Sequence, residues 1–319
     1  MTQKFLIGSL LFLIVSCAKE APKVPPPEQK IVQSQPQVPT FDEQRAFSYL
    51  TAQTDFGPRN PGSAGHEQCL EYLATEMKKS ADVVNLQHFT HTGYDGTAIK
   101  MTNIIASFNV QSTTRILLLA HWDTRPRADQ DKNPKKQNRP ILGANDGASG
   151  VAVLLEIARH LKETPPSVGI DILFDDGEDY GKESDLDNYF LGARYFATHL
   201  PTGYRPAFGI LLDMVGDKDL EIDREQNSVV AARDIVDLVW STARALGVTQ
   251  FSNLDQYVTD DHIPLNEAGI KTIDIIDLHY PDISNRYWHT TEDTPDKCSP
   301  ESLGAVGKVL MYVVYNYVP

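Results

Sequence analysis

The sequence predicts an α/β protein, a three-layer α/β/α sandwich around a mixed, mostly parallel central sheet. The first observation is that short apolar runs rich in β-branched residues alternate with amphipathic stretches from residue 41 onward. The second is that most of these runs are apolar nearly throughout, as expected for strands covered on both faces. The third is a hydrophobic content of 41% in 319 residues, which supports a sizeable core.

The elements can be taken in chain order. The predicted strands are Asn103–Phe108, Arg115–Ala120, Gly169–Phe174, Phe208–Leu212 and Ile270–Ile276. Apolar residues at helical spacing predict helices over 151–161 and 236–243. A last helix is predicted over Ser299–Tyr317, because Pro300 is well suited to a first turn.

The N-terminus predicts an exported, lipid-anchored protein. A short basic start at Met1–Lys4 precedes the apolar run Phe5–Val15, which is too short to span a bilayer, and Ile14-Val15-Ser16-Cys17 resembles a bacterial lipobox. The alternative is an ordinary signal peptide with an incidental cysteine. The predicted segments are a lipoprotein signal over 1–17 with lipidation at Cys17, a Pro/Gln-rich disordered tether over 18–40, and a single catalytic domain over 41–319. We therefore expect a cell-envelope location.

The net charge argues against a nucleic-acid partner, and the cysteine content leaves one disulfide possible. With 29 basic and 43 acidic residues, the net charge of −14 offers no basic surface for a nucleic-acid backbone. Export permits disulfides, so Cys69 and Cys298 are candidates for a pair, although the sequence does not show whether they meet.

Polar residues follow the predicted strands at their carboxyl ends, where function gathers in parallel sheets. His121 and Asp123 follow the strand ending at Ala120, and Asp213 ends another apolar run. A strand-end His with an Asp two residues later is often only structural, but the spacing also suits a metal ligand and the carboxylate that orients it.

A glycine-rich loop surrounds Asp146 in Gly143-Ala144-Asn145-Asp146-Gly147-Ala148-Ser149-Gly150. Asp146 could simply cap the following helix. However, so many small residues exceed what a cap requires, and they allow the backbone to approach an ion.

The run Asp175-Asp176-Gly177-Glu178-Asp179 is highly acidic at the end of a buried-looking strand. Such carboxylates repel one another unless a cation neutralises them or one holds a proton. Glu178 and Asp179 could divide the work, one carrying protons and the other binding metal. His289, in a loop before the last helix, completes a mixed oxygen and nitrogen ligand set of the kind that zinc accepts.

Taken in order, these segments resemble the co-catalytic zinc aminopeptidase superfamily, and more closely its bacterial-type glutaminyl-peptide cyclotransferase (glutaminyl cyclase) branch. The resemblance extends from Arg59-Asn60-Pro61-Gly62-Ser63 to the C-terminal helix. It implies the zinc aminopeptidase-like form of the predicted sandwich. The cyclase branch is favoured by Asp260-Asp261-His262-Ile263-Pro264 and by Tyr287-Trp288-His289-Thr290. Asp260 could also cap a helix starting near Ile263.

The resemblance implies specific roles. In the cyclases a single zinc is held by the positions matching Asp146, Asp179 and His289, and Glu178 shuttles a proton with Asp213 and Asp260 beside it. The substrate pocket is expected at Trp288, Val258 and His262. In the peptidases His121 and Asp213 would join Asp146 to hold a second zinc.

Three positions depart from the animal cyclases. Asp179 stands where those enzymes usually carry Glu, the segment 180–189 lacks their pocket tryptophan, and Asp274 replaces a His. These features resemble bacterial members instead.

We therefore expect zinc-dependent cyclisation of N-terminal glutamine to pyroglutamate with release of ammonia, with one zinc per chain. The expected partners are peptides or proteins with N-terminal Gln and a membrane reached through a lipid anchor, without nucleic acid, and the protein is expected to be a monomer. The alternative is a two-zinc aminopeptidase that hydrolyses N-terminal residues. A non-catalytic lipoprotein that binds peptide termini is a further alternative, disfavoured because Glu178 is intact.

Overall fold

The computed structural model describes residues 37–318. The predicted signal segment 1–17, with Cys17, and the tether up to residue 36 lie outside the described residues. None of the helices in the described part of the chain is long and apolar enough to cross a membrane.

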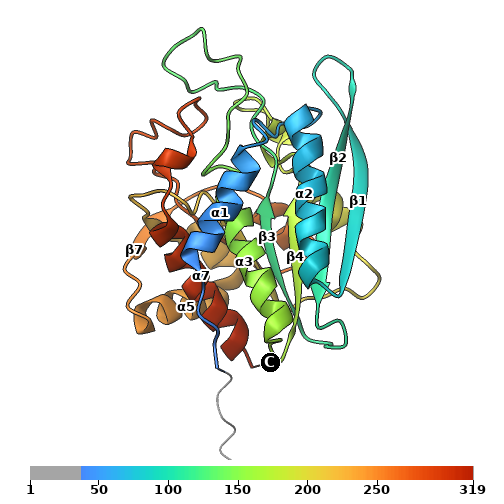
Figure 1. The fold of residues 1–319 in the computed structure, drawn as a ribbon, viewed down its shortest axis with the longest axis vertical. Coiled ribbons are helices and arrows are strands. Elements are labelled where there is room, and N and C mark those ends of the chain that lie inside the picture. Colours follow the sequence, from blue (N-terminus) through green and yellow to red (C-terminus); the bar gives the residue numbers. More distant parts are fainter. Residues whose placement is uncertain (1–36, 319) are drawn as a thin grey trace, which may run out of the picture. The chain divides into compact units, whose positions relative to one another are not determined.

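A six-stranded mixed sheet forms the middle of the fold (Figure 1). In spatial order its strands are β1 (Val83–Thr92), β2 (Ala98–Phe108), β4 (Gly169–Asp175), β3 (Arg115–His121), β5 (Phe208–Asp213) and β8 (Thr272–Ile276). β1, β2 and β4 pair antiparallel, whereas β4, β3, β5 and β8 are parallel to one another. The predicted mixed, mostly parallel sheet is therefore confirmed.

Helices cover both faces of the sheet. One layer contains α1 (Glu43–Thr54), α2 (Ala64–Ser80), α3 (Ser149–Glu163), α5 (Gln226–Ala245) and α7 (Pro300–Asn316). The other contains the shorter α4 (Leu191–Thr198) and α6 (His262–Glu267). A separate parallel pair is formed by β6 (Ile222–Glu225) and β7 (Phe251–Gln256). Short 3₁₀ helices are η1 (Glu178–Tyr180), η2 (Leu186–Asn188) and η3 (Pro295–Lys297).

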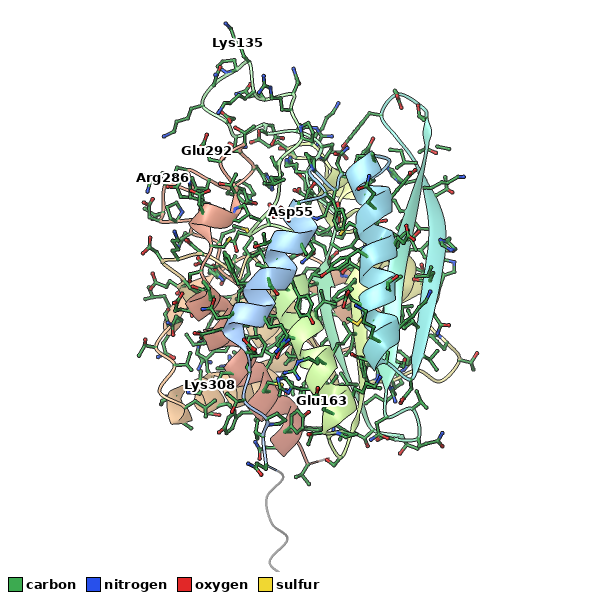
Figure 2. The ribbon with its side chains drawn as sticks, viewed as in Figure 1. Asp55, Lys135, Glu163, Arg286, Glu292 and Lys308 are labelled. Atoms are coloured by element: carbon green, nitrogen blue, oxygen red, sulfur yellow. The ribbon has the colours of Figure 1, made fainter. Side chains whose placement is uncertain are left out.

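Side-chain alternation along β3 explains the three layers. Ile116 and Leu118 pack into the larger core beneath α1, α3 and α7, while Leu117 and Leu119 pack into the smaller core with residues of α4 and α6. All four are fully buried, so the strand is apolar throughout, as the sequence indicates. Charged side chains such as Glu163 lie on the outside of this unit, as Figure 2 shows.

The predicted start of the last helix at Pro300 is confirmed, whereas neither Asp146 nor Asp260 caps a helix with its side chain. Ser299 caps α7 through its side chain, and Pro300 opens the helix as predicted. Asp146 does not cap α3, because the N-cap position is Ala148 and no side chain caps there. The side chain of Asp260 accepts a hydrogen bond from the Asp261 N–H (2.6 Å) rather than from the first turn of α6.

Cys69 and Cys298 are both buried and free in the described part of the chain. The disulfide that the sequence left open is therefore not formed, and both residues pack as small apolar side chains in the larger core.

Candidate metal centre and active site

The parallel strands bring three segments to one edge of the sheet. His121 is the last residue of β3 and lies opposite Asp175 of β4, while Asp213 is the last residue of β5. Asp179 follows β4 in η1. Because the carboxyl ends of parallel strands meet at one edge, residues far apart in sequence become neighbours.

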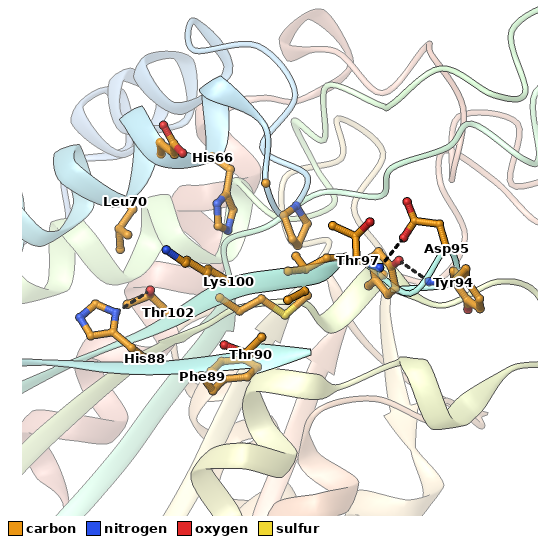
Figure 3. A pocket seen from close by; sticks show the side chains of 17 residues that line it. His66, Leu70, His88, Phe89, Thr90, Tyr94, Asp95, Thr97, Lys100 and Thr102 are labelled. Carbon is orange, nitrogen blue, oxygen red and sulfur yellow. Dashed lines mark hydrogen bonds between the residues drawn. The ribbon is translucent and has the colours of Figure 1, made fainter. Parts of the chain in front are cut away.

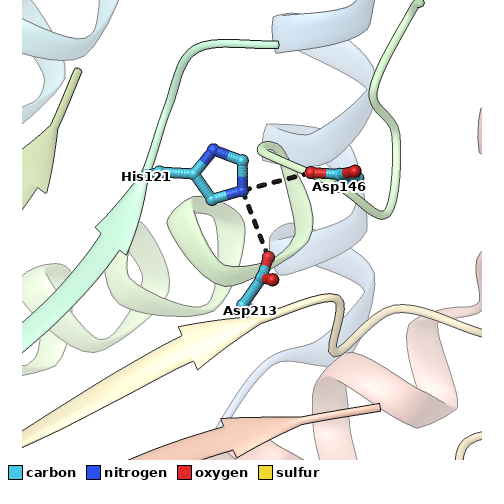
Figure 4. Close-up of side chains that lie close together, drawn as sticks. All are labelled: His121, Asp146 and Asp213. Atoms are coloured by element: carbon cyan, nitrogen blue, oxygen red, sulfur yellow. Dashed lines mark hydrogen bonds and ion pairs between the residues drawn. The ribbon is translucent and has the colours of Figure 1, made fainter. Parts of the chain in front are cut away.

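His121, Asp146 and Asp213 form a buried triad (Figure 4). The His121 Nε2 atom lies 3.1 Å from Asp213 Oδ1 and 3.3 Å from Asp146 Oδ1. On the other side of the ring, Nδ1 lies 3.5 Å from Asp123 Oδ1. Burial opposes a charged ring, but the three surrounding carboxylates outweigh it and raise the pKa of His121 well above its usual value.

Asp146, Asp179 and His289 form a second buried triad that shares Asp146 with the first. The His289 Nε2 atom lies 3.5 Å from Asp146 Oδ2 and 3.4 Å from Asp179 Oδ1. Burial and the nearby Arg125 hold the pKa of His289 well below its usual value, which favours the neutral ring that a metal ligand needs. Its backbone adopts φ 53°, in the left-handed region that few non-glycine residues enter.

The donor set fits zinc. In each triad, one imidazole nitrogen and two carboxylate oxygens lie within 4.8 Å of one another. Asp146 Oδ2 and Asp179 Oδ2 are buried without a hydrogen-bond partner, which is costly unless a cation takes up these oxygens. Mixed imidazole and carboxylate ligands at this spacing are typical of zinc sites.

The loop that carries Asp146 is fixed from two directions. The Asp293 carboxylate accepts hydrogen bonds from the backbone N–H groups of Asn145 (2.8 Å) and Asp146 (3.2 Å), and from the Tyr280 hydroxyl (2.9 Å). Gly147 has φ 104°, and a Cβ atom there would lie 2.3 Å from the carbonyl oxygen of Asp123. Only glycine therefore allows the loop to approach the end of β3 so closely.

Arg125 is a buried cation that the sequence analysis did not single out. Its Nη1 donates to Asp179 Oδ1, and its Nε and Nη2 donate to the two oxygens of Asp129 at 2.8 and 2.7 Å. Burial raises the pKa of Asp179 well above its usual value, and Arg125 opposes that rise.

Glu178 stands beside the second triad rather than in it. Its backbone N–H donates to Asp123 Oδ1 at 3.0 Å, so the carboxylate that orients His121 also anchors the Glu178 turn. Burial, followed by repulsion from Asp179, raises the pKa of Glu178 well above its usual value. A carboxyl with a raised pKa is suited to exchange protons near neutral pH.

A cavity of about 260 Å³ opens over the second triad. It contains five predicted residues, namely Glu178, Asp213, Asp260, Val258 and Trp288, together with Asp146, Asp179 and His289. Trp288 stacks on His289 with ring centroids 3.7 Å apart. Sequence reasoning missed the apolar part of the wall, which comprises Leu186, Tyr189, Phe190, Met214, Ile276 and Leu278.

The structure does not place His262 on the cavity wall, so that part of the pocket prediction is wrong. The ring is fully buried, with Nε2 3.2 Å from Glu225 and Nδ1 3.7 Å from Asp274. His262 is the first residue of α6, and its side chain lies between Glu225 and Asp274 inside the protein.

Fold and site together define an α/β metalloenzyme of the zinc aminopeptidase type. The sequence profile of Peptidase family M28 matches residues 103–314, and the chain belongs to that family. Within it, the chain resembles bacterial glutaminyl cyclases, as the sequence motifs predicted.

Solved structures show this likeness. The glutaminyl cyclase of Bacteroides thetaiotaomicron, bound to N-acetylhistamine, is 42% identical with a TM-score of 0.84, covering 88% of this chain and 100% of that one. A Zn-dependent exopeptidase from Parabacteroides distasonis gives the same four values. The glutaminyl cyclase of Tannerella forsythia is 39% identical, with a TM-score of 0.84, and covers 88% of this chain and 100% of that one.

Relatives among characterised proteins are more distant. The glutaminyl-peptide cyclotransferase of Bos taurus is 22% identical over 297 residues, covering 82% of this chain and 78% of that protein. Aminopeptidase YwaD of Bacillus subtilis is 28% identical over 218 residues, covering 66% of this chain and 42% of that protein.

Proposed function

We propose that the protein is a zinc-dependent glutaminyl-peptide cyclotransferase, which converts an N-terminal glutamine of a peptide or protein to pyroglutamate and releases ammonia. The observation that carries the proposal is the small cavity in which Asp260 and Trp288 meet the Asp146–Asp179–His289 triad. These are the two segments that distinguish the cyclase motifs from those of the peptidases.

The reaction needs a positioned substrate more than a strong external nucleophile. The α-amine nitrogen of the peptide forms a bond to its own side-chain amide carbon, the bond from that carbon to the amide nitrogen breaks, and ammonia leaves. Zinc held by Asp146, Asp179 and His289 would supply Lewis-acid polarisation of the amide carbonyl. A cavity of about 260 Å³ is small enough to restrict the glutamine to few conformers, which favours ring closure.

The surrounding acids handle the proton. Glu178 accepts a proton from the attacking amine and returns it to the leaving nitrogen, a role that fits a half-buried carboxyl with a raised pKa. Asp213 positions the amine from the opposite wall, and Asp260 hydrogen-bonds the Glu178 side of the cavity. Burial and repulsion from Asp213 raise the pKa of Asp260 well above its usual value, so it can remain protonated and donate.

We propose one zinc per chain, in the second triad. His121 and Asp213 then serve as hydrogen-bonding groups, an arrangement supported by the 3.1 Å contact between His121 Nε2 and Asp213 Oδ1.

A two-zinc aminopeptidase is the second candidate, and a specific observation favours it. The His121–Asp146–Asp213 triad is complete and shares Asp146 with the other. The solved structures that resemble this chain also include a Zn-dependent exopeptidase. In that enzyme Glu178 would act as the base for an attacking water.

Product analysis separates the two candidates. The soluble part, from about Phe41, is incubated with a Gln-starting peptide and the products are weighed by mass spectrometry. Cyclisation shows as a loss of about 17 Da, the mass of ammonia, from an otherwise intact peptide. Release of free glutamine from an unblocked peptide would instead identify an aminopeptidase.

We also propose that the protein is a monomer anchored in the cell envelope by a lipid on Cys17, with no nucleic-acid partner. The sequence Ile14-Val15-Ser16-Cys17 after a short apolar run supports the anchor. Replacing Cys17 by Ser should release the protein from membranes in a fractionation experiment. A Cys17→Ser protein that stays with the membrane would make the anchor assignment wrong.

A further inference from the structure

A second and larger cavity of about 1020 Å³ lies between α2 and the β1–β2 hairpin. Figure 3 shows His66 pointing from α2 toward the hairpin, with Lys100, His88 and Thr102 on the facing strands. None of its lining residues belongs to the cavity over the metal triad. The function proposed above makes no use of it.

His66 is held rigidly and keeps one ring nitrogen free. It is 4% exposed, and its Nε2 lies 2.9 Å from both oxygens of Asp176. The ring stacks on Trp122 with centroids 4.3 Å apart. Asp176 also accepts from the Thr102 N–H at 2.6 Å, so it cannot easily turn away. Among the described residues nothing hydrogen-bonds to His66 Nδ1, which is not among the fully buried atoms, and the His66 side chain lines the cavity.

This arrangement favours an imidazolium. Burial lowers the pKa of His66, but the charge of Asp176 and its hydrogen bond outweigh burial and raise the pKa above its usual value. A charged ring carries a proton on Nδ1 as well as on Nε2, so it presents a donor to the cavity.

The other charges around the cavity can be counted individually. Lys100 makes no ion pair with any described residue, and its side chain lines the same space. Pro61 and Gly62, which precede the first turn of α2, also line the cavity, so the positive end of the helix dipole is nearby. Against these stand two carboxylates, Glu67 on the exposed side of α2 and Asp95 at the hairpin tip. Asp95 is occupied by the Thr97 N–H at 2.9 Å.

We propose that this cavity is a second ligand site, which binds the carboxylate or phosphate group of a small organic anion through His66 and Lys100. The anion accepts from the His66 Nδ1–H and pairs with the Lys100 ammonium. The organic part rests on Tyr94 and Tyr180, whose stacked rings lie 5.4 Å apart on the cavity wall. A rigid buried donor and a flexible exposed cation together are a common way to hold an oxyanion.

Titration calorimetry on the zinc-loaded soluble protein tests the site with two probes, inorganic phosphate and succinate. Phosphate binding without succinate binding identifies a phosphate site, and the reverse identifies a carboxylate site. We expect one equivalent of probe per chain, with Lys100→Gln and His66→Gln each weakening binding by about tenfold, the effect of one charge-assisted hydrogen bond.

Two matched controls accompany the titration. Lys78→Gln removes an exposed lysine of α2 that lies outside the cavity lining, and it should leave probe binding unchanged. Lys100→Gln should also keep the turnover of a Gln-starting peptide, because Lys100 lies outside the metal cavity.

Three results would overturn the proposal. One is the absence of binding by both probes. Another is equal affinity in wild type, Lys100→Gln and His66→Gln. The last is a phosphate that inhibits turnover competitively and still binds Lys100→Gln at full strength, since that anion would be sitting on the metal.

Discussion

Gly147 is the residue at which the structure gives the sharpest mutational prediction. It follows the shared ligand Asp146 and has φ 104°. A Cβ atom there would lie 2.3 Å from the Asp123 carbonyl oxygen and 3.3 Å from His121 Cε1. The clashing atom is backbone at the end of β3, so no side chain can rotate out of the way. In Gly147→Ala the loop and the strand end must separate by about 0.7 Å to reach the closest tolerated contact, in a densely packed region.

A matched control removes the contribution of backbone conformation. Gly203 has φ 80° and nothing within 4 Å of an added Cβ atom. Gly203→Ala should therefore cost only the unfavourable positive φ, about 1 kcal/mol. Gly147→Ala carries that cost and an overpacking cost of about 2–3 kcal/mol. At about 2–3 °C per kcal/mol for a domain of this size, the melting temperature should fall by about 8 °C in Gly147→Ala and by about 2 °C in Gly203→Ala.

The measurement is thermal unfolding of zinc-free protein in chelator, so that metal affinity does not enter the comparison. Zinc titrations then follow, and we expect Gly147→Ala to bind zinc at least about tenfold more weakly, because the loop that carries the ligand Asp146 has moved. If Gly147→Ala melts within a degree or so of Gly203→Ala, the loop is not packed against β3 as described.

Three further predictions concern the number of bound zinc ions, the proton transfer by Glu178 and the buried carboxylate of Glu225. Wild type should hold about one zinc per chain by elemental analysis, retained in His121→Ala and lost in Asp146→Ala; two zincs with one lost in His121→Ala would indicate the aminopeptidase. Glu178→Gln should keep its zinc and lose turnover by about 10²–10⁴-fold, whereas loss of metal would make Glu178 a ligand. Burial alone would raise the pKa of Glu225, but hydrogen bonds from His262 and from the first turn of α5 lower it to about 2, below its ordinary value of 4.5. The stabilisation is therefore present above pH 4.5 and lost as pH falls toward 2, so Glu225→Gln should cost about 2 kcal/mol at neutral pH and progressively less in acid. Urea unfolding of wild type and Glu225→Gln at neutral pH and in acid checks this. An equal loss of unfolding free energy under the two conditions would contradict it.

The central strands were predictable because burial on both faces leaves a plain apolar run. The run predicted at 115–120 is β3 (Arg115–His121), and the one at 208–212 is β5 (Phe208–Asp213). The edge strand β8 (Thr272–Ile276) is buried throughout and was predicted at 270–276, but β1 at the other edge and β7 of the separate pair were not. β1 carries Asn, Gln, His and Thr residues and has no buried residue, and three of the six residues of β7 are exposed. Such strands are held by pairing with a neighbour, which leaves little trace in hydrophobicity.

The site was predictable to the extent that its residues end strands or sit in motifs. The two triads and the acids beside them are brought together by strand order. The groups that hold them in place were missed, because nothing in the local sequence marks an Arg125 that pairs with Asp179 or an Asp293 that fixes the Asp146 loop. The misplacement of His262 has the same origin, since a motif names a residue without showing which way a short helix turns it.

The fold shows how the carboxylates of the acidic run at 175–179, which would repel one another, are accommodated. Asp176 pairs with His66, and Asp179 pairs with Arg125. Asp175 and Asp261 are fully buried carboxyls without a donor among the described residues, and burial raises the pKa of both above its usual value. The carboxylate of Glu178 makes no hydrogen bond or ion pair with the described residues, and unlike the equally unpartnered Asp175 it lines the cavity. Its raised pKa therefore comes from burial and from its neighbours rather than from a fixed partner. A carboxyl without a fixed partner can change its protonation state without breaking a structural contact. Because Glu178 has this property and also lines the cavity, it is the acid of the run that is able to transfer a proton to or from a bound ligand.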